Sequence, residues 1–137
     1  MTIFEVIKKY EEDGDFTHYE VSEDIIDDME KQLQLKLPKE YVDFLRLFGH
    51  GGLVGFEVLG VGKNGNYVFC NVTIRYRKIG LPNELIVIED CDEWVYCIDT
   101  KDNTVVMWAQ DENIKVAYDS FMDYLSDRVQ DALENNY

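Results

Sequence analysis

The stretch "LPKEYVDFLRLFGHGG", residues 37–52, decides the fold. Four apolar residues take the i, i+3, i+4 and i+7 positions that mark the buried face of a helix: Tyr41, Phe44, Leu45 and Phe48. Pro38 stands where a helix tolerates proline best, in its first turn, and Gly49 supplies a left-handed stop. We therefore expect a buried helix here, followed by a glycine turn.

The glycines after this helix predict a turn rather than a phosphate-binding loop. The sequence G-H-G-G lacks the spacing and the lysine of a phosphate loop. It also leads from a helix into an extended segment, whereas phosphate loops lead from a strand into a helix. Gly51 and Gly52 are interpreted as turn residues, and His50 as incidental, because the only other histidine, His18, stands in an acidic loop far along the chain.

The remaining sequence predicts helices at both ends and strands between them. Apolar stripes at helical spacing indicate helices over residues 2–12 and 23–33 and from about residue 119 onward. Strands are expected over 53–62, where glycines interrupt the pattern, and over 84–91, 93–100 and 104–110. Residues 66–78 fit either element, since their β-branched composition favours a strand while Val68, Val72 and Ile79 keep helical spacing.

These elements assemble into a single α+β domain spanning residues 1–137. We expect a mainly antiparallel central sheet of about four to six strands, flanked by N-terminal helices and a C-terminal helix. In "WVYCID" both alternating sets of side chains are apolar, which indicates a central strand covered on both faces. The last two predicted strands form a hairpin around "KDN".

Charge narrows the possible partners. The chain carries 13 basic and 28 acidic residues, a net charge of −15, with −9 in residues 1–30 and −5 in residues 111–137. Such a field repels nucleic acid and anionic membranes, so direct binding to either is not expected. It attracts basic partners, although acidity equally serves solubility alone.

Neither catalytic nor metal-binding chemistry is indicated. The chain has no nucleophile elbow, no H-E-x-x-H motif and no C-x-x-C pair, so no catalytic residue, metal or cofactor is assigned. The three cysteines are expected to be reduced thiols in a cytoplasmic protein, since no secretory signal or membrane-length apolar run is visible. A small hydrolase that uses a pair of carboxylates is kept as a remote hypothesis.

The assembled motifs resemble those of the SUKH superfamily. The helix "SEDIIDDMEKQLQLKLP", the pattern Y-x-x-F-L-x-x-x-G-x-G-G, the segment "GFEVLG" and the block "LPNELIVIEDCDEWVYCIDTKDNTVVMWAQ" carry the resemblance, which covers nearly the whole chain. The family implies a helix over residues 66–78. Its bacterial members are typically cytoplasmic antidotes to toxin domains, often nucleases, and its fungal members regulate cell-wall assembly.

The resemblance and the charge lead to a binding hypothesis. We expect an immunity protein that neutralises a cognate toxin domain, a nuclease above all, through acidic side chains at the strand ends: Asp90, Asp92, Glu93, Asp111 and Glu112. Trp94 would anchor a partner if exposed, but a place in the core is favoured. The alternative is an intracellular scaffold or regulatory module without a toxin partner.

Overall fold

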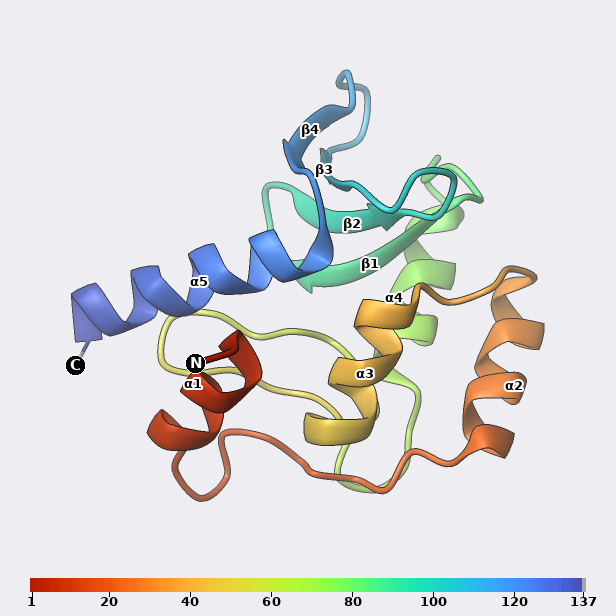
Figure 1. Ribbon diagram of the computed structural model, residues 1–137. Coiled ribbons are helices and arrows are strands. Elements are labelled where there is room, and N and C mark those ends of the chain that lie inside the picture. The colour runs from red at the N-terminus through yellow and green to blue at the C-terminus, as the bar shows by residue number, and fades with distance from the viewer. Residues whose placement is uncertain (137) are drawn as a thin grey trace.

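The computed structural model describes residues 1–136 and has the expected α+β architecture (Figure 1). Along the described chain the elements are α1 (Ile3–Tyr10), α2 (Glu23–Leu33), α3 (Lys39–Phe48), α4 (Val68–Arg77), β1 (Leu85–Asp90), β2 (Val95–Asp99), β3 (Val105–Trp108), β4 (Lys115–Tyr118) and α5 (Phe121–Asn136). The strands form one antiparallel sheet in the order β1-β2-β3-β4. The expectation of a single domain with helices before and after an antiparallel sheet is confirmed.

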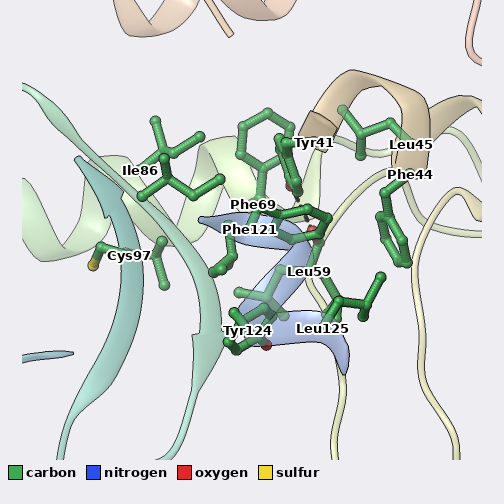
Figure 2. Packing of buried hydrophobic residues seen from close by; sticks show 14 of the residues in the cluster. Tyr41, Phe44, Leu45, Leu59, Phe69, Ile86, Cys97, Phe121, Tyr124 and Leu125 are labelled. Carbon is green, nitrogen blue, oxygen red and sulfur yellow. Dashed lines mark hydrogen bonds between the residues drawn. The ribbon is translucent and has the colours of Figure 1, made fainter. Parts of the chain in front are cut away.

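Helix α3 supplies the centre of the core, as its spacing predicts. All four residues of its apolar stripe are fully buried: Tyr41, Phe44, Leu45 and Phe48. Figure 2 shows the Tyr41 ring beside Phe69 and Phe121, and its hydroxyl donates a hydrogen bond to the Leu59 carbonyl. Pro38 is the N-cap rather than a first-turn residue, and Gly49 ends the helix at a φ of 77°. The buried stripe thus joins the N-terminal helices to the rest of the core.

The other helices begin and end at recognisable caps. Thr2 and Glu5 form a capping box at the start of α1, and the Ser22 side chain accepts the Ile25 N–H at the start of α2. Helix α1 ends at Tyr10, two residues before the predicted end, because Glu11 adopts an extended conformation. The second predicted helix, residues 23–33, is confirmed to the residue.

The ambiguous segment is a helix. In α4 the buried face carries Phe69, Cys70 and Thr73, and the Thr73 hydroxyl accepts the N–H of Val87 in β1 at 2.9 Å. This hydrogen bond and the apolar packing around it hold β-branched residues in a helix against their local preference. The expectation drawn from the family resemblance is therefore confirmed.

Helices cover both faces of the sheet. On one face Tyr96 packs against Tyr124 of α5, with ring centroids 5.5 Å apart. On the other face Trp108, which pairs with Val95 across β2 and β3, packs against Tyr76 of α4 at 5.9 Å. Residues 95 and 96 point to opposite faces, and each face meets a helix, so the predicted double covering of the central strand is confirmed. Figure 1 shows β4 at the outer edge of the sheet.

One predicted strand is absent, and one observed strand was not predicted. Residues 53–62 form a connection instead of a strand, because the Phe56 N–H bonds back to the Leu53 carbonyl across a turn, and Val58 and Val61 make only single bridges, to Gly51 and Tyr67. Conversely, β4 was not predicted. This strand has only four residues and is largely open to solvent, and Val116 is 64% exposed. The segment therefore lacks the apolar alternation of a half-buried strand.

The glycines after α3 lie where three backbone segments meet, and we call residues 15–18, 49–52 and 58–61 the glycine junction. Gly51 and Val58 exchange hydrogen bonds of 3.0 and 2.9 Å, and Gly52 donates to the Asp15 carbonyl at 3.2 Å. Gly51 has a φ of 137°, and a Cβ there would collide with the Asp15 carbonyl oxygen. The glycines therefore allow the backbone segments to approach each other closely, which agrees with their interpretation as turn residues.

His50 holds this junction together. Its Nδ1 accepts the Gly60 N–H at 2.9 Å, which leaves the proton on Nε2, 3.5 Å from the Glu57 carboxylate. The hydrogen bond from His50 lowers the pKa of Glu57. Because both ring nitrogens face structural partners, His50 serves the fold, and the interpretation of it as incidental understated its role.

A buried ion pair fastens α5 to the sheet. Glu89 of β1 is only 5% exposed, and it follows a register shift in the pairing of β1 with β2. Its carboxylate accepts hydrogen bonds from the Tyr124 hydroxyl at 2.7 Å and from Arg128 at 2.7 and 3.0 Å. The guanidinium of Arg128 lies over the rings of Phe56 and Tyr96. The carboxylate is thus satisfied within the protein, as a buried charge must be.

Candidate partner-binding cleft

Sheet topology brings two acidic loops to the same end of the sheet. In an antiparallel meander the turn after the first strand and the turn after the third lie at one end, because the chain reverses twice between them. The register agrees, since Asp90 pairs with Val95 and Val95 pairs with Trp108. Residues 91–94 and 109–114 therefore lie side by side although they are far apart in the sequence.

The two loops and the end of α4 enclose a cleft of about 440 Å³. Its walls are Tyr76, Ile79, Asp92, Glu93, Trp94, Val95, Trp108, Ala109, Gln110 and Glu112. We call this set the acidic–aromatic cleft. Carboxylates and large rings dominate its lining, so apolar and negatively charged surfaces occur within one hollow.

Three of the five sequence-predicted residues line this cleft together. Asp92, Glu93 and Glu112 are exposed, and among residues 1–136 their carboxylates make no ion pair and no hydrogen bond. Asp90 lies beside the cleft but is already engaged by internal partners. Asp111 is exposed on a turn with a φ of 63° and does not line the hollow. The predicted set thus divides into an inner group of three and two neighbours.

Asp90 shapes the first of the two loops. Its carboxylate accepts the Asp92 N–H and the Tyr76 hydroxyl, each at 3.0 Å, and lies 3.6 Å from the Arg75 guanidinium. The hydrogen bond to its own chain two residues on allows the left-handed conformation of Asp92, whose φ is 67°. The Cys91 N–H closes the loop on the Trp94 carbonyl at 2.9 Å. Asp90 therefore positions its acidic neighbours.

Of the aromatic walls, only Trp94 was considered from the sequence, and Tyr76 and Trp108 were not. The ring of Tyr76 meets that of Trp108 edge to face, with an angle of 82° between the ring planes. Burial, and to a lesser extent the hydrogen bond to Asp90, raises the pKa of Tyr76. Trp94 is partly buried, so it is neither the core residue that was favoured nor a freely exposed anchor. Its indole Nε1 is buried near the Tyr96 hydroxyl without reaching hydrogen-bond geometry. The available signal was the placement of two tryptophans at strand ends.

The composition of the cleft suits a cation with an apolar stem. Carboxylates pair with positive charge, and the faces of tryptophan and tyrosine attract it as well. Nowhere in residues 1–136 do three or more histidine, cysteine, aspartate or glutamate side chains converge in a way that could hold a metal ion. The carboxylates and rings that line the cleft are the groups with which proteins recognise organic cations.

A second hollow, between α2 and α3, has a different character. Its lining carries both signs of charge, and Arg46 already pairs with Glu23 at 2.6 Å, while Lys36 and Lys39 stand on the same rim. Such a surface neutralises itself and shows no preference for one sign of ligand. The acidic–aromatic cleft is the stronger candidate because its charges have one sign.

Comparison with known proteins assigns the family. The sequence model of the family SUKH_5, described as "SMI1-KNR4 cell-wall", matches residues 3–130. The chain belongs to the SUKH family. The sequence-level recognition is therefore confirmed, and the match includes both loops of the cleft.

A solved structure shares the fold of this SUKH domain. The crystal structure of a protein from Pseudomonas syringae pv. tomato superposes with a TM-score of 0.74 at 23% sequence identity, covering 91% of this chain and 94% of that chain. At this identity the likeness speaks for the fold alone. None of the helices among residues 1–136 of the SUKH domain has the length and apolar character that crossing a membrane requires.

Proposed function

We propose that this SUKH domain is an immunity protein that binds a cognate toxin domain in the cytoplasm and blocks its action. Family membership supports the proposal, because bacterial SUKH domains include antidotes to toxins. The observation that carries it is the cleft in which Asp92, Glu93 and Glu112 lack an ion-pair partner within residues 1–136. Carboxylates held together without cations favour a basic protein surface opposite them.

A nuclease is the toxin class that this charge fits best. Its active site binds phosphate and is therefore basic, and a net charge of −15 attracts such a surface over a distance of about 8–10 Å at physiological salt. Steering of this kind raises association rates by about 10- to 1,000-fold at low salt. The acidic domain would then occupy the cleft intended for nucleic acid and exclude the substrate.

Coexpression tests the proposal directly. The toxin gene is sought in the neighbouring reading frame and expressed with and without this domain. Survival of the cells that carry both genes is the expected result. Cells that die as readily with the domain as without it would refute the antidote role.

Salt dependence tests the electrostatic part separately. If acidic steering operates, the association rate of the purified complex falls steeply between low and physiological salt, while the dissociation rate changes little. An association rate that is insensitive to salt would leave shape complementarity alone as the basis of binding. The nuclease assignment would then lose its electrostatic support.

A scaffold or regulatory role is the second candidate, favoured by the cell-wall description of the matching family. In that case the neighbouring gene encodes no toxin, and the domain binds defined partners of its own cell. Affinity capture with the domain, followed by binding measurements on each purified partner, distinguishes the two roles. The cleft would serve as the contact surface in either case.

A further inference from the structure

We infer that the acidic–aromatic cleft receives one arginine side chain of the bound partner. The inference rests on the proposed function for the source of that arginine, since it names the chemistry by which the toxin is recognised. It concerns a specific subsite formed by the end of α4 and two loops of the sheet. The general negative field of the protein is a separate effect.

The cleft has the size and lining for a long basic side chain. Its volume of about 440 Å³ lies within the range of small-ligand sites, about 300–1,000 Å³. Ile79, 45% exposed in the turn that follows α4, offers an apolar wall for the methylene stem. The partly buried Trp94 lies beside the carboxylates, where a planar guanidinium can stack on its ring and donate hydrogen bonds at once. Trp108 also lines the cleft but is only 6% exposed, so it contributes little ring surface.

The protein's own arginines already make this combination of contacts. Arg128 lies over the Tyr96 ring and donates to the Glu89 carboxylate. Arg75, next to the cleft, lies over the Tyr76 ring at 5.4 Å and 3.6 Å from the Asp90 carboxylate. In both places a guanidinium joins an aromatic ring to an acid. The cleft presents the same two kinds of group, and no arginine of the described chain occupies it.

Among residues 1–136, no lysine or arginine lines the acidic–aromatic cleft. Lys115 lines an adjoining small hollow together with Trp94 and Glu112, and it forms no ion pair with any residue of the range 1–136. Charge disfavours a second copy of this protein as the occupant, because two chains of net charge −15 repel each other. The surface therefore fits a basic partner.

Both tryptophans of the protein line the cleft, which makes a direct test possible. The two indole N–H resonances of Trp94 and Trp108 can be followed by NMR while the blocked tripeptide Gly-Arg-Gly is added. The matched probe is Gly-citrulline-Gly, which has nearly the same shape without the charge. We expect the arginine peptide to shift both resonances with millimolar affinity and the citrulline peptide to shift neither.

A charge-neutral variant tests the carboxylates. The triple change Asp92→Asn, Glu93→Gln and Glu112→Gln removes three charges whose side chains make no hydrogen bond within the described chain, so the fold is kept. Asparagine also tolerates the left-handed backbone at position 92. Affinity for the arginine peptide should fall at least about tenfold, because three charge interactions are lost.

A matched control variant separates the cleft from the overall field. The changes Glu20→Gln, Asp123→Asn and Glu134→Gln remove the same charge from exposed positions that do not line the cleft. This variant should bind within about twofold of the unmodified protein, since distant exposed charges are screened. An equal loss of affinity in both variants would overturn the inference, because the field alone would then explain binding.

Other probes can also overturn it. A lysine tripeptide or spermidine that binds as tightly as the arginine peptide would reduce the cleft to a general acidic patch. Absence of any indole shift with the arginine peptide would exclude the site, while protection against a toxin in coexpression would still support the immunity role. Conversely, arginine binding without any protection would reject the immunity role and keep the cleft.

Discussion

Replacing Arg128 with methionine should destabilise the protein by about 3–5 kcal/mol, since it leaves the other member of a buried ion pair without its cation. Glu89 and Arg128 have side-chain exposures of 6% and 18%, so solvent screens the pair little. Burial by itself lowers the pKa of Arg128, but the hydrogen bonds and charge of Glu89 outweigh burial and raise it. The shift indicates that the pair stabilises the charged guanidinium. Methionine keeps much of the apolar packing over Phe56 and Tyr96.

Urea unfolding followed by circular dichroism measures this loss. With a urea slope of about 2 kcal/mol per molar, a loss of 4 kcal/mol lowers the midpoint by about 2 M at an unchanged slope. The double variant Glu89→Gln/Arg128→Met should regain about 1–3 kcal/mol relative to the sum of the single changes, because a neutral amide needs no cation. The Arg128→Met variant remaining within about 1 kcal/mol of the original, or strict additivity in the double variant, would refute the reasoning.

Three further outcomes are expected. The change Gly51→Ala should lower the free energy of unfolding by more than about 2 kcal/mol. The control Gly80→Ala should cost clearly less, because Gly80 shares a positive φ but has open space around it. Equal losses in the two variants would contradict the close backbone approach at the junction. Burial raises the pKa of Tyr41 and Tyr124, so their contribution to stability is complete below the ordinary tyrosine pKa of about 10 and is lost as pH rises through the pKa of the folded state. Unfolding in base should therefore coincide with the appearance of phenolate absorbance. Phenolate formation without unfolding would contradict this prediction. Burial raises the pKa of the Cys70 thiol to about 12, so a thiol reagent at neutral pH should label it only as fast as the protein opens; immediate labelling of the folded protein would contradict the burial.

The helical part of the fold could be read from the sequence because its signals are local. The stripe of α3 repeats at helical spacing, and Ser22 and Thr2 mark helix starts by side-chain chemistry that acts within one turn. Strands β1, β2 and β3 were recognisable because their apolar runs are continuous and bounded by turn residues. Such features need no knowledge of distant contacts.

Residues whose role depends on distant neighbours were not predictable. Glu89 is one acid among 28, and nothing near it in the sequence announces Tyr124 or Arg128 opposite its carboxylate. Val116 in β4 has strand character only because it pairs with β3 at the edge of an existing sheet. Long-range pairing supplied what local pattern lacked in both cases.

The acidic residues of the candidate site could be predicted from the sequence, but most of its aromatic walls could not. The acids at the strand ends could be recognised in the sequence. The antiparallel topology then places Asp92, Glu93 and Glu112 at the same end of the sheet, where they line one cleft. The walls required the crossing of α4 over the sheet, which places Tyr76 against Trp108. Helix-to-sheet packing of this kind leaves no trace in local sequence, so Tyr76 and Trp108 were not recognised as walls of the site.

The glycine junction has a consequence for how the acidic N-terminal segment can be manipulated. Thr17 and His18 donate backbone hydrogen bonds to His50 and Phe48, so this segment is stitched into the middle of the protein. Cutting it away would remove the backbone of Asp15 and Phe16 that packs on Gly51, and the resulting loss of structure would be mistaken for an effect of the lost charge. The acidic N-terminal segment is a structural part of the domain, so its charge should be tested by substituting one carboxylate at a time and not by truncation.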